Sequence, residues 1–311
     1  MTRILVTGVS GLLGSNLALA AAPRYEVVGV VHRQGLHNPG FETVQADLLD
    51  LDGLGPLLDA VQPDWVVNCA ALANLNQAEQ QPQLARRLNT EMPGRLAAEA
   101  AARGLRLVHI STDAVFDGSK GNYRETDGPK PLSVYAQSKR MAELAVKSAH
   151  PGAILARTVF FGWSVNGQQS LAEFFYNNLS AGQSVQGHTD RRFCPLLVTD
   201  LAELLLEMLD KDLNGIYHVA SADSITKYEF GLALAERFGL DPSSIEPAES
   251  TAHNPAAKRS PDLSLNTSRL VGALGRRPPS IARGIEGLHA QLENGHRLRL
   301  RAMAESQPQE G

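Results

Sequence analysis

Short, apolar, β-branched segments alternate with helical patterns through the first half of this 311-residue chain. Alternation of this kind is typical of βαβ units, whose parallel strands form one sheet with helices on both faces. Several segments are apolar on successive residues, as expected for strands buried on both sides. The expected strands are 3–7, 26–31, 43–46, 65–69, 106–110 and 153–157, and the expected helices are 12–22, 54–61, 83–103 and 133–149. Six such strands predict a doubly wound parallel α/β sheet.

After about residue 160 the pattern changes to glycine-punctuated polar loops around a few longer elements. The sequence predicts helices near 170–179, 201–209 and 227–238 and a strand at 215–219, followed by a Pro- and Ser-rich stretch over 241–261. We therefore expect a first domain over 1–160, to which a segment near 190–213 returns. A smaller, partly discontinuous domain over 161–300 would bind substrate, and a polar tail over 304–311 would be flexible.

Composition and charge exclude several classes of protein. The chain carries 29 Lys and Arg against 33 Asp and Glu, without a basic block, so we expect no nucleic-acid partner. Its two cysteines, Cys69 and Cys194, are far apart, and its nine histidines show no close metal-ligand spacing, so neither a disulfide framework nor a metal site is expected. No stretch reaches the ~20 apolar residues of a membrane helix, and the first apolar run is too short for a signal peptide. These features predict a cytoplasmic protein without a membrane partner.

The first expected strand ends in a turn with glycines three residues apart, and an Ala- and Leu-rich helix follows. The free N–H groups and positive dipole end of that helix would point out of the turn, where a pyrophosphate binds well. Side chains at the first two glycines would block this approach, and the third would let helix and strand pack closely. A structural turn is the alternative, but its place in the first βαβ unit favours dinucleotide binding. The expected contacts are Gly8, Ser10, Gly11, Leu12, Leu13 and Gly14.

The end of the second strand bears on which dinucleotide would bind. An NAD site usually has a carboxylate there for the ribose hydroxyls, whereas an NADP site needs a cation for the 2′-phosphate. Here the strand ends in His32 and Arg33, with no acid, which favours NADP(H) with Arg33 on the phosphate. An exposed loop arginine is the alternative. Asp47, after the third strand and before Leu48, would face the adenine or cap the next helix.

Tyr135 and Lys139 lie four residues apart at the start of an expected helix. This spacing puts the phenol and the ammonium on one helical face. We expect the cation and the helix N-terminus to lower the pKa of Tyr135 from its ordinary value of ~10, which would let the phenol donate a proton near neutral pH. A surface pair is the alternative.

The fifth strand ends at the edge of the sheet where ligands of doubly wound folds bind, and hydroxyl residues follow it there. Thr112 would hydrogen-bond the same substrate oxygen as Tyr135 while charge develops on that oxygen. The alternative is that Ser111 and Thr112 only satisfy backbone groups of the loop.

These motifs together resemble the extended short-chain dehydrogenase/reductase superfamily, and more closely the dTDP-4-dehydrorhamnose reductase family. The superfamily motifs are Thr7 to Gly14, Asn68-Cys-Ala-Ala, Ser111-Thr-Asp and Tyr135-x-x-x-Lys139. The closer match lies in Ile110 to Gly118, Tyr123 to Asp127, Pro131 to Lys139, Gly215 to His218, and Arg259 through Leu265-Asn266. The resemblance implies a Rossmann-like fold and NADPH-dependent reduction of the C4 ketone of a dTDP-linked deoxyhexulose.

The resemblance also implies roles for individual residues. Thr112, Tyr135 and Lys139 would be catalytic, with Lys139 also holding the nicotinamide ribose, while Ala70 and Ala71 would line the cofactor cleft. The substrate would contact Thr112, Asp113, Phe160, Arg192 and Arg259. Charged, forked hydrogen bonds from Arg157, Arg191, Arg192 and Arg259 would suit a diphosphate, with surface ion pairs as the alternative.

The chain departs from the family pattern around the sugar. Ala114 stands where the family commonly has Tyr, Ala73 where it has Thr, Asn76 where it has Asp, and Phe160 where it has Trp. Ser260 and Leu263 occupy the Pro and Ser positions of the C-terminal Arg-Pro-x-x-Ser-x-Leu pattern. The segments 191–193 and 225–229 also resemble the non-catalytic β regulatory subunit of methionine adenosyltransferase, which binds NADP. The sequence therefore leaves open that the protein is a regulatory subunit, an epimerase or a reductase of another carbonyl. It also leaves open that the protein forms a homodimer.

Overall fold

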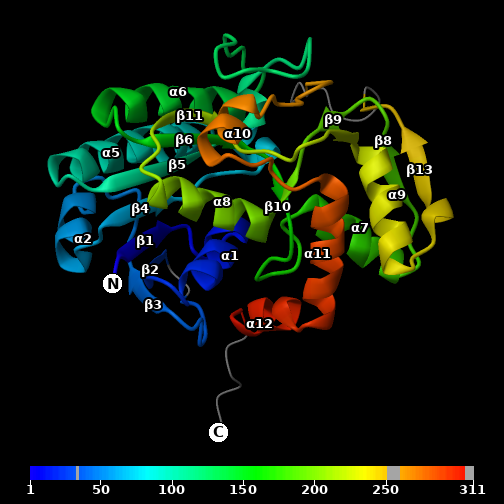
Figure 1. Cartoon of the computed structure of the whole chain (residues 1–311), viewed down its shortest axis with the longest axis horizontal. Coiled ribbons are helices and arrows are strands. Elements are labelled where there is room, and N and C mark those ends of the chain that lie inside the picture. Colours follow the sequence, from blue (N-terminus) through cyan, green and yellow to red (C-terminus); the bar gives the residue numbers. More distant parts are fainter. Residues whose placement is uncertain (33–34, 251–259, 305–311) are drawn as a thin grey trace, which may run out of the picture.

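The computed structural model describes residues 1–32, 35–250 and 260–304. A seven-stranded sheet lies at its centre, in the order β11-β6-β5-β4-β1-β2-β3, and every neighbouring pair is parallel (Figure 1). The strands are β1 (Arg3–Thr7), β2 (Glu26–Val31), β3 (Glu42–Gln45), β4 (Trp65–Asn68), β5 (Arg106–Thr112), β6 (Ile154–Thr158) and β11 (Gly215–His218). The predicted Rossmann-like, doubly wound α/β class is confirmed.

The sheet is buried on both faces because alternate residues of a strand belong to different cores. In β1, Ile4 and Val6 pack in the core beneath α1 (Leu12–Ala21) and α8 (Val198–Asp210). Leu5, between them, packs in the opposite core with α2 (Leu54–Val61), α5 (Met92–Ala102) and α6 (Val134–Ala149). Since helices cover both faces, a ligand finds room at the edge where the strands end and their loops leave the sheet.

The sheet has one strand more than the six expected from the first half of the chain. β11 corresponds to the strand predicted at 215–219. The prediction does not place this strand in the main sheet, because it lies beyond the segment 190–213 that is expected to return to the first domain. It pairs with β6 from Gly215 opposite Ile154 to His218 opposite Arg157. α8 packs on α1 and leads the chain to this sheet edge. A four-residue apolar pattern does not reveal which sheet its strand joins, because either partner would bury the same side chains.

The helix predicted over 83–103 is confirmed as a continuous helical segment, but it contains a π-helical turn (Arg87–Glu91) between α4 (Pro82–Arg86) and α5. Pro93 lacks the N–H that would continue regular helical bonding through the turn. The buried Asn89 amide also accepts a hydrogen bond from Leu72 N at 2.7 Å and donates one to Ser138 Oγ at 3.0 Å. The π turn thus ties the loop after β4 to α6.

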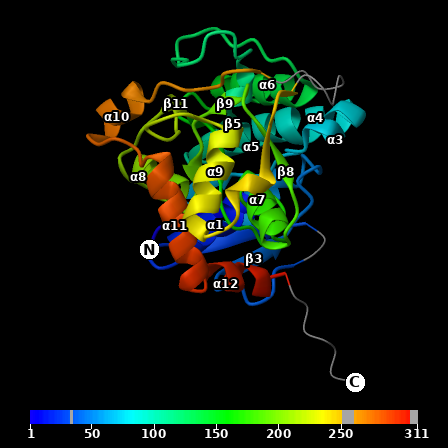
Figure 2. The same cartoon turned by 90° about the vertical axis from the view of Figure 1, so that its right-hand side faces the viewer.

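The second lobe lies beside the sheet (Figures 1 and 2). Buried aromatic rings form much of its core. Phe161, Trp163, Phe175 and Phe230 are each at most 1 % exposed. Its main elements are α7 (Leu171–Ser180), β8 (Val185–His188), α9 (Lys227–Phe238), β13 (Ile245–Ala248), α11 (Ile281–Glu293) and α12 (His296–Ala302), and β13 pairs parallel to β8. Where one domain ends and the next begins stays a prediction.

Further short elements complete the fold, and some of them carry residues of the site. They are α3 (Leu75–Gln80), the 3-10 turns Asp113–Val115 and Pro242–Ser244, β7 (Phe160–Phe161) paired with β10 (Leu196–Leu197), β9 (Arg192–Phe193) paired with β12 (Ile225–Thr226), and α10 (Ser268–Leu274). Within the described ranges, no helix combines the length and apolar character that crossing a bilayer requires.

Candidate active site

The glycine turn folds back on itself between β1 and α1. Gly8 has φ +66°, and its carbonyl accepts a hydrogen bond from Gly11 N at 2.9 Å. A cavity of about 270 Å³ opens beside the turn, and Gly8, Ser10 and Gly11 line it. The side chains of Leu12 and Leu13 point into the core instead, so only their backbone would face a ligand. The turn therefore presents backbone N–H groups to a cavity, as phosphate binding requires.

Gly14 has a different role from the other two glycines, because it sets the distance between α1 and the turn. A Cβ there would lie 2.2 Å from the carbonyl oxygen of Gly8. We expect Gly14→Ala to weaken NADPH binding about tenfold, because overpacking by one methyl shifts the backbone that faces the phosphates. Fluorescence titration with NADPH measures this loss. Gly272→Ala, which adds its methyl where no heavy atom lies within 4 Å, serves as the control, and equal affinity of the two variants would contradict the assignment.

The other end of this cavity contains the residues predicted to face the adenosine. His32, Asp47 and Leu48 line it, together with Ala70 and Ala71. Asp47 Oδ1 accepts from Leu49 N at 2.9 Å and lies 3.7 Å from His32 Nε2. The bond to Leu49 N closes a local turn, so Asp47 is not a cap of α2, which begins at Leu54. Arg33 lies outside the described residues.

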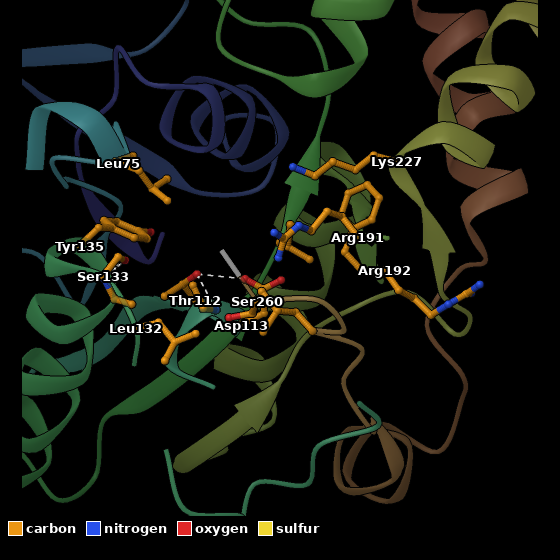
Figure 3. A pocket seen from close by; sticks show the side chains of 16 residues that line it. Leu75, Thr112, Asp113, Leu132, Ser133, Tyr135, Arg191, Arg192, Lys227 and Ser260 are labelled. Atoms are coloured by element: carbon orange, nitrogen blue, oxygen red, sulfur yellow. Dashed lines mark hydrogen bonds between the residues drawn. The ribbon is translucent and has the colours of Figure 1, made fainter. Parts of the chain in front are cut away.

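A second cavity, of about 390 Å³, lies where β5 meets α6 and the second lobe (Figure 3). Thr112 is the last residue of β5, and Tyr135 lies in the first turn of α6, whose N-cap Ser133 accepts from Ala136 N. Both residues line this cavity, and Thr112 lies near enough to Tyr135 to influence its pKa. Two of the three predicted catalytic side chains therefore meet in one pocket.

Lys139, the third predicted catalytic residue, lies one helical turn beyond Tyr135 and is 2 % exposed. Its Nζ lies 3.2 Å from His109 Nε2. Burial lowers the pKa of Lys139 to about 8, and the negative charge of Glu143 opposes this shift. Lys139 lines neither cavity, but it lies near Cys69 of the glycine-turn cavity and one helical turn from Tyr135 of the second, so it lies between the two.

The predicted lowering of the Tyr135 pKa is wrong. Burial raises the pKa of Tyr135 to about 12, the nearby Thr112 hydroxyl opposes this rise, and the Asp113 charge adds to it. The four-residue spacing indicates a shared helical face, but it does not report the loss of hydration that dominates here. The phenol is therefore fully protonated at neutral pH, which is the state that a proton donor needs.

Asp113 follows Thr112 and accepts a hydrogen bond from the Thr112 hydroxyl at 3.0 Å. Burial raises the pKa of Asp113 to about 6, and the positive charge of Lys227 opposes this rise. Lys227 and Arg191 come from the second lobe and lie across the cavity from Tyr135 in Figure 3. The cavity thus combines a cationic wall with the hydroxyl pair, although the resemblance over 225–229 gives Lys227 no role in the site.

The other predicted substrate residues do not all line this cavity. Arg192 lines the cavity, but its guanidinium turns away from Thr112 (Figure 3) and donates to Ser224 O at 3.1 Å. Phe160 is not among the lining residues; it packs against the core under α1, and its neighbour Val159 lines the cavity instead. Arg157, considered for a diphosphate, forms a buried ion pair with Glu143. Arg259 lies outside the described residues, and Ser260 beside it lines the cavity.

Both cysteines lie in the described part of the chain. Burial raises the pKa of the Cys69 thiol to about 12 and raises the pKa of Cys194 as well, so neither is a ready thiolate nucleophile. No group of three His, Cys, Asp or Glu side chains is arranged there to hold a metal ion.

Comparison with known proteins identifies the family. The family model for the RmlD substrate-binding domain matches residues 1–293. The chain is 33 % identical to the probable low-salt glycan biosynthesis reductase Agl14 of Haloferax volcanii, over 93 % of this chain and 98 % of that protein. It is also 33 % identical to methionine adenosyltransferase 2 subunit beta of Bos taurus, over 89 % and 84 % of the two chains. The dTDP-4-dehydrorhamnose reductase of Mycobacterium tuberculosis H37Rv is 33 % identical over 83 % of each chain.

Solved structures share the whole fold. A hypothetical dTDP-4-dehydrorhamnose reductase from Sulfolobus tokodaii superposes with a TM-score of 0.80 at 29 % identity, covering 91 % of this chain and 99 % of that one. The dTDP-4-dehydrorhamnose reductase from Bacillus anthracis, solved in complex with NADP, gives a TM-score of 0.81 at 23 % identity, covering 94 % and 100 %. The family match spans both lobes and both cavities, and the chain therefore belongs to the RmlD substrate-binding domain family.

Proposed function

We propose that this protein is an NADP(H)-dependent reductase of a nucleotide-linked keto sugar. The observation that carries the proposal is the meeting of Thr112 and Tyr135 in one cavity, with Lys139 linking them to the cavity beside the glycine turn. The reductases among its relatives and the Bacillus anthracis neighbour that binds NADP support the same chemistry.

The residues of the first cavity suit a dinucleotide. The turn at Gly8 and Gly11 leaves room for a pyrophosphate that a side chain would fill, and the start of α1 supplies free N–H groups. Ala70 and Ala71 line the same cavity without bulky side chains, and Lys139 would hold the nicotinamide ribose. When bound, NADPH supplies the hydride for reduction of a carbonyl carbon.

The residues of the second cavity serve the carbonyl oxygen. Tyr135 holds its proton at neutral pH and would donate it to that oxygen. Thr112 would hydrogen-bond the same oxygen, and its own bond to Asp113 fixes where its hydroxyl lies. Arg191 and Lys227, on the opposite wall, would attract the diphosphate of a nucleotide sugar.

The finer proposal is that the substrate is dTDP-4-dehydrorhamnose or a closely related dTDP-linked hexulose. Support comes from the Mycobacterium tuberculosis relative, which bears the name dTDP-4-dehydrorhamnose reductase. The test is NADPH consumption by the purified protein with dTDP-4-keto-6-deoxyhexose, followed by identification of the reduced sugar. Turnover of this sugar supports the proposal. Turnover only with unrelated ketones would reject the proposed substrate but support the proposed reductase function.

A regulatory role is the second candidate, favoured by the similarity to methionine adenosyltransferase 2 subunit beta over 89 % of this chain. In that case the protein would bind NADP tightly, and no ketone of a broad panel, nucleotide sugars included, would consume NADPH. An epimerase would convert its sugar with no net consumption of NADPH. NADPH consumption identifies the reductase, and analysis of the sugar after incubation separates the epimerase from the regulatory subunit.

The coenzyme preference depends on Arg33, which the sequence places directly after β2. We expect Arg33→Ala to weaken NADPH binding about 10- to 100-fold, because a charged hydrogen bond to the 2′-phosphate is lost. NADH binding should stay within about twofold, since NADH lacks that phosphate. Titrations with both coenzymes measure the difference, and Arg24→Ala, at a surface ion pair with Glu203, controls for the loss of one positive charge. An equal loss for NADPH and NADH would reject the assignment.

A further inference from the structure

A row of buried polar side chains extends behind Lys139, away from the substrate cavity. His109 of β5, Asn68 of β4 and Thr7 of β1 are each at most 1 % exposed. His109 Nε2 lies 3.2 Å from Lys139 Nζ, and His109 Nδ1 lies 3.0 Å from Asn68 Nδ2. Asn68 Oδ1 accepts from the Thr7 hydroxyl at 2.6 Å. The sheet register aligns this row, since Thr7 is opposite Asn68 and Asn68 is opposite His109.

His109 is neutral in this place for two reasons. Burial lowers its pKa well below the ordinary range, and the charge of Lys139 lowers it further. A protonated imidazole would put a second cation beside the ammonium, whereas a neutral ring offers one lone pair. Lys139 is also influenced by Glu143 on its own helix and by Cys69 after β4. The Glu143 carboxylate already accepts hydrogen bonds from Arg157, Arg140 and Ser111, and among the described residues His109 is the hydrogen-bond partner of Lys139 Nζ.

We propose that His109 is a positioning residue for the reduction, whose Nε2 accepts a hydrogen bond from the Lys139 ammonium and holds it charged between the two cavities. The proposal rests on the reductase function proposed above. An ammonium has three N–H donors and no acceptor, so one donor goes to His109 and two are left for ribose hydroxyls. A buried ammonium without this acceptor would lose charge as burial disfavours its charged form.

The row of side chains also predicts how the ring changes with the charge of Lys139. A charged Lys139 donates to the lone pair of His109 Nε2, so the ring proton lies on Nδ1. The Asn68 amide then turns its oxygen toward the Nδ1 proton and accepts a hydrogen bond from it. A neutral Lys139 amine accepts from Nε2–H instead, and Asn68 then donates through Nδ2 to Nδ1, with the Thr7 hydroxyl donating to Asn68 Oδ1. The tautomer of His109 should therefore exchange as Lys139 loses its proton near a pKa of about 8.

The kinetic test compares His109→Leu, which removes the acceptor, with His109→Gln, whose amide oxygen restores one. In His109→Leu we expect kcat at neutral pH to fall about tenfold and KM for the keto sugar to stay within about twofold. Activity should be lost at a pH about one unit lower than in the wild type, since the ammonium deprotonates earlier. His109→Gln should recover both values to within about threefold. The proposal would be overturned if the pH profile of His109→Leu matched that of the wild type. It would also be overturned if the profile of His109→Gln matched that of His109→Leu.

A spectroscopic test needs no turnover. Nitrogen NMR of the wild type with labelled histidine reports which ring nitrogen carries the proton, and the His109 signals are those absent from His109→Gln. They should pass from the Nδ1–H to the Nε2–H tautomer as the pH rises through about 8. A fixed tautomer across that range would overturn the proposal even in an active reductase. If the tautomer exchanges but the protein reduces no ketone, the proposed reductase function is rejected, whereas the hydrogen bonding between Lys139, His109 and Asn68 is supported.

Discussion

Tyr135→Phe is expected to lower turnover about 1000-fold, because it removes the proton donor from the cavity and leaves the shape of the side chain almost unchanged. The Tyr135 hydroxyl meets Thr112 there, and burial keeps it protonated by raising its pKa to about 12. NADPH affinity should stay within about twofold, because the pyrophosphate contacts come from the glycine turn. Steady-state NADPH consumption and NADPH titration measure the two effects separately.

Tyr25→Phe is the matched control for this variant. It also removes one phenolic hydroxyl, the one that donates to Asp210 at 2.8 Å on the outer surface, and it should leave turnover unchanged. Retained turnover in Tyr135→Phe would mean that another group delivers the proton. Asp113 would then be examined first, since its carboxyl lines the same cavity and its pKa is raised to about 6.

The sequence predicts the fold well because its signals are local. Strands buried on both sides give continuous apolar segments, and each is followed by a helix, so β1 to β6 can be found before their pairing is known. The place of β11 beside β6 is a long-range property of the fold. The π-helical turn at Arg87–Glu91 likewise depends on Asn89 bonding Leu72, which lies outside that helix.

The residues of the site also differ in how far the sequence alone can predict them. The glycine turn, Thr112 and the Tyr135–Lys139 pair are recognisable because sequence spacing alone places them at a strand end or on one helical face. Lys227 comes into the cavity from the second lobe, and His109 reaches Lys139 from a neighbouring strand, so no spacing connects them. The direction of the Tyr135 pKa also depends on burial, which requires the whole fold.

The buried ion pair between Arg157 and Glu143 holds α6 against the sheet, and its removal is the second large effect that we expect. Arg157 Nε and Nη2 donate to the two Glu143 carboxylate oxygens, each at 2.8 Å, and both side chains are 1 % exposed. Arg157→Met should lower the free energy of unfolding by about 3–5 kcal/mol, because a carboxylate without its main partner would remain buried. Urea unfolding followed by circular dichroism measures the loss.

Two further variants separate the ion pair from general damage to the fold. The double variant Arg157→Met with Glu143→Leu should recover most of the lost stability, since no charge is left buried. Arg24→Met breaks the exposed pair with Glu203 and should change stability by less than about 1 kcal/mol. A loss below about 1 kcal/mol in Arg157→Met would show that Ser111 and Arg140, which also donate to Glu143, satisfy the carboxylate alone. Because Glu143 lies one turn beyond Lys139 on α6, the pair that stabilises the fold also fixes the helix that positions Tyr135 and Lys139.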